Sequence, residues 1–335
     1  MVRFVSYGLG PIGSLITSVA LARNGYELVG AIDVSPSIVG KDVGQVLGLN
    51  KLMGIKVESD AETVLKNTKP DVVFHATGSY LDKVYDQISL SIVHHADVIS
   101  TCETLAYPYY RYPELAAKLD NEAKRYGVSV VGLGINPGFL MDLLPSLLTA
   151  PCVKISKIEV TRSLDASKRR KSFQKKIGLG LSQEEFRRRL LSGDITCHVG
   201  FSESVLLIAS IIGVRLQKVT ETTEPLLAKE EISVGDIRIK ESHVRGILGQ
   251  GIGYINGLDF IRLKLIAAVG EEDYEEIKIR GEPSLTWRCI TGTPGDIATA
   301  AIVVNSVQRV IEARPGLLTV KDILPPVCPV VDVKL

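Results

Sequence analysis

The chain has 335 residues, of which 45% are hydrophobic and 23% are charged, and its formal net charge is +1. This length allows two domains, each with its own hydrophobic core. A net charge so close to zero provides no field that would recruit nucleic acid or an anionic membrane. No apolar run approaches the roughly 18 residues of a membrane span, and the five cysteines include no C-x-x-C pair. We therefore expect a cytoplasmic protein with reduced thiols and neither a nucleic-acid nor a membrane partner.

The first predicted strand, residues 3–7, ends in a glycine turn with the spacing G-x-G-x-x-G, and a helical pattern begins directly behind it. This order of strand, turn and helix is typical of dinucleotide binding, because the helix N-terminus offers backbone N–H groups to the pyrophosphate. The next strand, residues 27–33, ends in a carboxylate at the place where an adenosine ribose is bound in such folds. The predicted cofactor-binding residues of this region are Gly8, Leu9, Gly10, Pro11, Ile12, Gly13, Asp33 and Ser35.

The carboxylate of Asp33 also bears on the choice of cofactor. A negative charge beside the ribose repels the 2′-phosphate of NADP, which favours NAD. Ser35, Ser37 and Lys41 lie close by in the sequence and soften that exclusion. We therefore predict NAD as the cofactor and leave NADP possible.

Strands and helices alternate through the first 133 residues. Further strands are predicted at 55–57, 71–75, 96–100 and 128–133, with helices at 60–67, 81–94 and 112–126. This alternation predicts a Rossmann-type, doubly wound parallel sheet, whose ligands lie beyond the carboxyl ends of the strands. The strand ends that follow the glycine turn and Asp33 carry further predicted cofactor-binding residues, namely Ala76, Thr77, Gly78, Cys102 and Asn136.

Glu103 is our first candidate for a catalytic residue. It follows a buried strand at the edge where a nicotinamide is expected. A carboxylate in that position can act as a general base. The alternative is that Glu103 caps the next turn or pairs with a lysine.

The segment Asn136-Pro137-Gly138-Phe139 follows the sixth strand. Its proline and glycine predict a turn that aims the Asn136 amide at the nicotinamide or the substrate. The alternative is a turn that merely opens a helix at 140–148.

The pattern changes in the second half, where residues 153–162, 216–223, 260–268 and 274–280 alternate apolar and polar. This period predicts a mixed or antiparallel sheet with one covered face, so that the whole chain is α/β with an additional α+β domain. Ser182 and Glu185 predict a capping box, and a second helix is expected at 203–212. An apolar helix at 297–312 is expected to return to the nucleotide domain.

We predict a dinucleotide-binding domain of residues 1–140 joined by 294–335, and a substrate-binding and dimerisation domain of residues 141–293. A homodimer through the open sheet is expected.

Two residues of the second domain are candidates for the site. Arg162 ends a strand, where a guanidinium can clamp a carboxylate, and His198 is the second candidate; the alternative for each is a surface or hinge position. The other histidines have no metal-ligand spacing, so no metal is predicted. The basic run 168–171, with Lys175 and Lys176, indicates a solvated loop or a lid hinged at Gly178 and Gly180 rather than a nucleic-acid surface.

Together these stretches resemble the 2,4-diaminopentanoate dehydrogenase family, which includes the native amine dehydrogenases and is related to dihydrodipicolinate reductase and diaminopimelate dehydrogenase. The similarity covers nearly the whole chain. It is carried by Gly8–Gly13, His75-Ala76-Thr77-Gly78-Ser79-Tyr80-Leu81, Ser100-Thr101-Cys102-Glu103, Asn136-Pro137-Gly138-Phe139, Phe173–Gly178 and Pro294-Gly295-Asp296.

The resemblance implies a reversible, NAD(P)-dependent deamination of an amine carbon to a ketone, with a small amine or ketone and ammonia as partners. It implies Glu103 as the catalytic acid/base. It also implies that Asn136, Phe139, Arg162 and His198 line the substrate pocket, with Arg162 as the partner of a substrate carboxylate. Two alternatives stay open. One is a dihydrodipicolinate reductase-like or other imine reductase, although its run of adjacent histidines followed by a lysine is missing near residues 130–180. The other is a dinucleotide-binding sensor without turnover.

Overall fold

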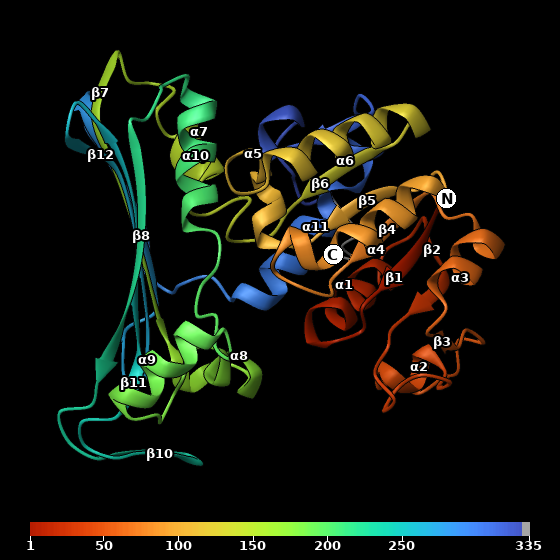
Figure 1. Cartoon of the computed structure of the whole chain (residues 1–335), viewed down its shortest axis with the longest axis horizontal. Helices are drawn as coiled ribbons and strands as arrows, with labels where there is room; N and C mark the ends of the chain where they lie inside the picture. The colour runs from red at the N-terminus through yellow and green to blue at the C-terminus, as the bar shows by residue number, and fades with distance from the viewer. Residues whose placement is uncertain (330–335) are drawn as a thin grey trace, which may run out of the picture. The chain divides into compact units, whose positions relative to one another are not determined.

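The computed structural model describes residues 1–329 and divides into two compact units (Figure 1). Unit 1 combines residues 1–140 with the segment that begins at Pro294, and unit 2 is Met141–Thr293. Each unit has its own sheet and its own hydrophobic core. Among the described residues no helix is both long and apolar enough to cross a membrane.

Unit 1 contains a seven-stranded sheet in which every pairing is parallel, in the order β15-β6-β5-β4-β1-β2-β3. The strand order reverses between β1 and β4, which is the switch point at which such sheets bind ligands. The predicted Rossmann-type sheet is confirmed. Its strands are β1 (Val2–Tyr7), β2 (Tyr26–Ile32), β3 (Val57–Glu58), β4 (Val72–His75), β5 (Asp97–Ser100), β6 (Ser129–Gly132) and β15 (Gly316–Leu318).

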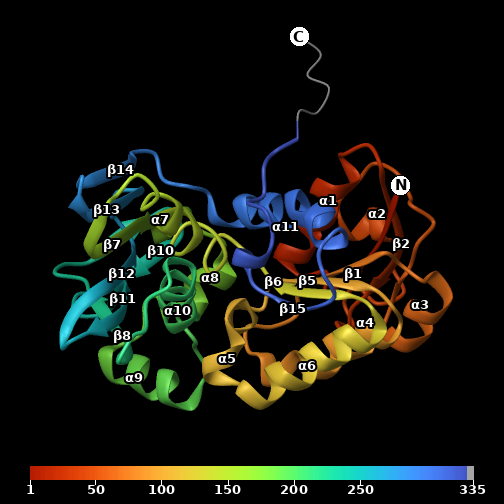
Figure 2. The same ribbon diagram turned by 90° about the horizontal axis from the view of Figure 1, so that it is seen from above.

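Helices cover both faces of this sheet (Figure 2). One face carries α1 (Pro11–Leu21) and α11 (Gly295–Ile311), which pack against each other, and the other carries α3 (Ala61–Thr68), α4 (Leu81–Val93) and α6 (Pro113–Tyr126). The predicted return of the last long helix to the nucleotide domain is confirmed, because Arg23 donates to the Asn305 side chain at 2.6 Å. Asp60 caps α3, and Gly127 ends α6 with a φ of +72°. Both caps agree with the sequence.

Unit 2 contains a six-stranded mixed sheet in the order β14-β13-β7-β12-β11-β8, in which only β7 and β12 run parallel to each other. The helices of unit 2 lie along one face of this sheet, and no helix of the described unit covers the other (Figure 1). The strands are β7 (Lys154–Asp165), β8 (Lys218–Leu227), β11 (Val244–Ile255), β12 (Leu258–Ala268), β13 (Tyr274–Glu282) and β14 (Leu285–Cys289); β9 (Ile232–Val234) and β10 (Ile237–Ile239) form a separate hairpin. The helices are α7 (Leu143–Leu147), α8 (Lys171–Lys176), α9 (Gln183–Ser192) and α10 (Phe201–Ile212).

The strand β11 was not predicted, because its glycines weaken the signal for a strand. The structure shows why they are there. A Cβ at Gly249 would lie 2.6 Å from the Phe201 ring, and one at Gly251 would lie 2.8 Å from the Phe201 Cβ. The glycines therefore let α10 lie directly on the strand.

Only one of the two hydrogen bonds of the capping box predicted at the start of α9 is present. The Ser182 hydroxyl accepts from the Glu185 N–H at 3.2 Å, as expected. The Glu185 carboxylate does not return the bond to the Ser182 backbone but binds Arg188 and Arg189, with its closest contacts at 2.6 Å. Charge-assisted bonds to two guanidinium groups outweigh one bond to a backbone amide.

Candidate active site

The glycine turn between β1 and α1 combines two close approaches with one open space. Gly8 has a φ of +93°, and a Cβ there would lie 2.7 Å from the Ala76 carbonyl oxygen, so a side chain is excluded twice. A Cβ at Gly13 would lie 1.8 Å from the Gly8 carbonyl oxygen. Gly10, the N-cap of α1, has no neighbouring atom within 4 Å of a Cβ position. This open space and the first-turn amides of α1 fit a pyrophosphate.

Asp33 follows β2 and is tied to the glycine turn. Its Oδ2 accepts from the Leu9 N–H at 2.7 Å, and its Oδ1 accepts from the Ser35 N–H at 2.8 Å. Each carboxylate oxygen has a second acceptor position. The half-buried carboxylate is therefore fixed in orientation and can still accept bonds from ribose hydroxyls.

The end of β4 contains a hydrogen-bond network that the sequence did not reveal. The buried ring of His75 places Nδ1 2.8 Å from the Ser100 hydroxyl and Nε2 2.9 Å from Gln87 Oε1. Burial lowers the pKa of His75 to about 4, so the ring is neutral at physiological pH. Gln87 Oε1 can only accept, so Nε2 carries the proton and Nδ1 accepts from Ser100. Thr77, in the following turn, bonds to both His75 and Gln87.

This network supports the backbone just before Glu103. The Ser100 hydroxyl oxygen accepts from the Cys102 N–H at 3.1 Å, so the links from Gln87 through His75 reach the turn after β5. The sequence analysis gave His75 no role in positioning, although its place at the end of a predicted strand was an available signal. A buried neutral histidine with three polar partners can position the groups it binds.

Glu103 begins a short 3₁₀ helix, η1 (Glu103–Ala106), at the carboxyl end of β5. Thr104 holds this helix in place, since its N–H donates to the Ser79 carbonyl at 3.1 Å and its hydroxyl accepts from the Leu81 N–H at 2.8 Å. A Cβ at Gly132 would lie 2.6 Å from the Ala106 nitrogen, so η1 rests directly on β6. The half-buried Glu103 is therefore fixed at the same sheet edge as the glycine turn.

The turn from Asn136 to Phe139 is anchored on both sides. The Ile135 N–H donates to the Thr299 hydroxyl on α11 at 3.3 Å. Gly138 has a φ of +125°, and a Cβ there would clash with the Gly134 backbone at 2.7 Å. The Asn136 Oδ1 is buried and has no hydrogen-bond partner among the described residues. An orphaned acceptor at this edge fits the carboxamide N–H of a nicotinamide. The helix expected at 140–148 is shorter than predicted and spans Leu143–Leu147.

In unit 2, Arg162 is held by a buried acid. Arg162 and Glu275 face each other on β7 and β13 and are 3% and 1% exposed. The Arg162 Nε lies 3.4 Å from Glu275 Oε1, and its Nη2 donates to the Thr293 carbonyl at 2.8 Å. Glu275 Oε1 also accepts from the Thr293 N–H at 2.9 Å. The alternative of a surface position for Arg162 is therefore wrong.

His198 lies beside α10, where its ring meets the Phe201 ring edge-on at a centroid distance of 4.5 Å. Burial, followed by the charges of Lys176 and Arg162, lowers the pKa of His198 to about 3. The ring is neutral at physiological pH, so it does not act as a cation. Because the Arg162 charge contributes to the lowered pKa of His198, the two residues lie near each other in unit 2.

The basic run forms structure rather than an open loop. Lys168 pairs with Asp273 at 2.8 Å, and Lys171, at the start of α8, pairs with Asp236. The glycines expected to be hinges, Gly178 and Gly180, lie directly after α8 with positive φ.

The candidates thus fall into two groups. The parallel sheet of unit 1 gathers the glycine turn, Asp33, residues 76–78, Cys102, Glu103, Asn136 and Phe139 at or near the carboxyl ends of its strands. Unit 2 contributes Arg162 and His198. Sequence reasoning missed Glu275, although a charged residue at an inward position of an alternating strand was an available signal. Among residues 1–329, no three His, Cys, Asp or Glu side chains gather as a metal site.

Comparison with known proteins gives a family for both halves of the chain. The family model of the 2,4-diaminopentanoate dehydrogenase C-terminal domain matches residues 139–334, and the model of the dihydrodipicolinate reductase N-terminus matches residues 3–101. The chain is 32% identical to 2,4-diaminopentanoate dehydrogenase from Acetoanaerobium sticklandii, over 96% of this chain and 93% of that protein. It is 24% identical to an amine dehydrogenase from Streptomyces virginiae, over 96% of both chains.

The solved structures agree with this assignment. An amine dehydrogenase from Mycobacterium smegmatis has a TM-score of 0.87 and 27% identity, covering 98% of this chain and 97% of that one. Dihydrodipicolinate reductase from a Paenisporosarcina species has a TM-score of 0.54 at 15% identity, over 97% of this chain and all of that one, and shares the fold alone. The family suggested by the residues is therefore confirmed: the chain belongs to the 2,4-diaminopentanoate dehydrogenase family of oxidoreductases.

Proposed function

We propose that the chain catalyses the reversible oxidative deamination of a short amine, 2,4-diaminopentanoate or a close analogue, with a nicotinamide dinucleotide as the electron acceptor. The overall reaction converts the ammonium form of the amine, NAD⁺ and water into a ketone, NADH, ammonium and a proton. The names of the relatives support the reaction class. The observation that carries the proposal is the position of Glu103, whose carboxylate lies at the same sheet edge as the dinucleotide turn.

Glu103 performs the proton transfers. The bound cofactor supplies the acceptor for the hydride that leaves the amine carbon. Before that step the Glu103 carboxylate accepts a proton from the substrate ammonium, so that the nitrogen lone pair can form the C=N bond as the hydride departs. Glu103 then releases this proton to solvent, which is the proton of the overall reaction, and the carboxylate stabilises the positive iminium. It finally takes a proton from the attacking water and returns one to the departing ammonia.

The other candidate residues bind and orient. Asn136 is the proposed partner of the nicotinamide carboxamide, on the strength of its orphaned buried oxygen. Phe139, Arg162 and His198 remain the proposed substrate-binding residues. Because Glu275 already faces the Arg162 guanidinium, a substrate carboxylate would share that cation rather than neutralise it alone.

NAD is the proposed cofactor, with NADP as the alternative. The carboxylate of Asp33 is fixed by the Leu9 and Ser35 amides, so it cannot swing away from a 2′-phosphate without breaking both bonds. Comparing kcat/KM for the two dinucleotides tests this, and a strong preference for NADP would contradict the role of Asp33.

The experiment that tests the function is amine-dependent reduction of NAD, followed by the absorbance of the reduced nicotinamide. We expect NAD reduction with 2,4-diaminopentanoate, and no oxidation of NADH when dihydrodipicolinate and NADH are supplied instead. Turnover with dihydrodipicolinate alone would favour the reductase alternative, which the match of residues 3–101 keeps open. Binding of NAD without turnover of any amine or imine would favour the sensor.

We also propose a cytoplasmic homodimer. The open face of the unit 2 sheet presents apolar side chains, Leu248, Ile252 and Ile266, that no helix of the described unit covers. A second copy would bury this face and protect the sheet. A measured mass of one chain in sedimentation would reject the dimer.

A further inference from the structure

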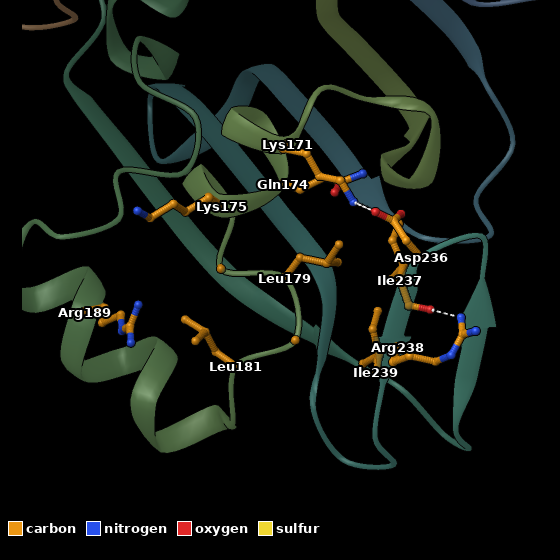
Figure 3. Close-up of a pocket in the computed structure, with 12 residues that line it drawn as sticks. Lys171, Gln174, Lys175, Leu179, Leu181, Arg189, Asp236, Ile237, Arg238 and Ile239 are labelled. Carbon is orange, nitrogen blue, oxygen red and sulfur yellow. Dashed lines mark hydrogen bonds and ion pairs between the residues drawn. The ribbon is translucent and has the colours of Figure 1, made fainter. Parts of the chain in front are cut away.

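A cavity of about 330 Å³ lies wholly within unit 2, between α8, α9 and the β9–β10 hairpin (Figure 3). Its volume is in the range of small-molecule sites. Neither Arg162 nor His198 lines it, so the cavity belongs to none of the groups to which the proposed reaction assigns a role.

The floor of the cavity is apolar. Leu179 and Leu181 follow α8 and are half-buried, while Ile237 and Ile239 are buried on the hairpin. Figure 3 shows these side chains between the helices and the hairpin. Branched apolar side chains around a hollow favour a ligand with a hydrocarbon body.

The charged groups at its rim are predominantly cationic, with four basic side chains and one acid. The acid, Asp236, is already ion-paired with Lys171. Arg238 turns towards its own hairpin, where its Nη1 donates to the carbonyls of Gly235 and Ile237 at 2.8 and 2.9 Å. On the hairpin side, the acid is therefore neutralised by Lys171, and one terminal nitrogen of Arg238 is already used by its own hairpin.

The helical side of the rim is not saturated. The Lys175 ammonium is exposed and makes no hydrogen bond or ion pair within the part of the chain that the structure describes. Arg189 uses its Nε to bind Glu185 at 2.6 Å, and its two terminal nitrogens make no hydrogen bond or ion pair within the described residues 1–329. Figure 3 shows Lys175 and Arg189 on the same side of the cavity, opposite the hairpin.

We propose that this cavity binds a small organic anion, with its hydrocarbon body on the leucine and isoleucine floor and its carboxylate or phosphate between Lys175 and Arg189. A planar guanidinium and a mobile ammonium together satisfy several oxygens of such a group. The apolar floor provides contact area that an inorganic ion cannot use.

The test uses the full chain with methyl-labelled isoleucine and leucine, titrated with hexanoate, hexyl phosphate and 1-hexanol in the presence of saturating NAD. We expect both anions to shift the methyl signals of Leu179, Leu181, Ile237 and Ile239, and the alcohol to bind at least about tenfold more weakly because it lacks the charge. Binding of only one of the two anions identifies the head group that the site prefers and still supports an anion site.

The variant Lys175→Gln/Arg189→Gln should lose about tenfold or more in affinity for the anions. The matched control is Lys118→Gln/Arg187→Gln, which removes the same two charges from exposed positions outside the cavity. Equal binding of alcohol and anions, unchanged affinity in the double variant, or shifts confined to methyl groups elsewhere would each overturn the proposal.

Discussion

At the scale of single residues, His75 and His198 are both neutral because burial opposes their protonation. The two rings have different surroundings. His75 is fixed by Ser100 and Gln87 at the edge where the reaction is proposed, whereas His198 rests on Phe201 in unit 2. With pKa values lowered this far, neither ring carries a charge at physiological pH, and the proposed acid/base role falls to Glu103.

The depressed pKa of His75 predicts a pH-dependent stability. The unfolded chain binds a proton at about 6.5 and the folded chain only at about 4, so between these values the unfolded state binds more protons. The contribution of the neutral ring is therefore fully present above pH 6.5 and is lost as the pH falls towards 4, by up to about 3 kcal/mol. Urea unfolding across this window should show a shallower pH dependence for His75→Gln than for the wild type. Equal slopes would show that the ring is not a buried neutral group.

At the scale of elements, two glycines of the glycine turn have different roles, Gly10 in cofactor binding and Gly13 in folding. Gly10→Ala places a methyl group in open space, so the melting temperature should stay near that of the wild type while NAD binds more weakly. Gly13→Ala drives a Cβ towards the Gly8 carbonyl oxygen and should destabilise the fold itself. Thermal unfolding and NAD titration of the two variants measure the contrast. Loss of stability in Gly10→Ala, with NAD affinity unchanged, would contradict this account of the turn.

The pair between β7 and β13 makes a second prediction. Glu275→Gln removes a buried negative charge from beside the Arg162 guanidinium and should lower the free energy of unfolding by about 3–5 kcal/mol. The control is Glu276→Gln on the same strand, which loses only a pair with the half-exposed Lys278 and should cost less than about 1 kcal/mol. Chemical unfolding of both variants checks the difference. A Glu275→Gln cost no greater than that of the control would show that Glu275 does not balance Arg162.

The elements that were predictable are those with a clear period. Alternating strands and helices gave the parallel sheet of unit 1, and period-2 patterns gave four strands of unit 2. Three strands of these sheets, β11, β14 and β15, were not predicted, and two of them show why. β15 has only three residues and is held by its pairing with β6. β11 contains glycines because Phe201 lies directly against this strand, and those glycines weaken its sequence pattern. Both depend on contacts between segments far apart in the sequence, which a local pattern does not contain.

At the scale of the whole molecule, the sequence located the candidate chemistry through topology. Parallel strands bring their carboxyl ends to one edge, so Glu103 and Asn136 became candidates from strand order alone. What holds them there was not predictable. The network through His75, the packing of η1 on Gly132 and the bond from Ile135 to Thr299 all join distant segments.

The central claim is that Glu103 performs the acid/base chemistry of amine oxidation, and Glu103→Gln tests it most directly. The substitution keeps the size of the side chain and removes the charge, so NAD should bind as in the wild type while kcat/KM for the amine falls by roughly 10²-fold or more. Glu114→Gln, an exposed change on α6, is the control and should leave both quantities unchanged. Turnover of Glu103→Gln at the wild-type rate would contradict the account.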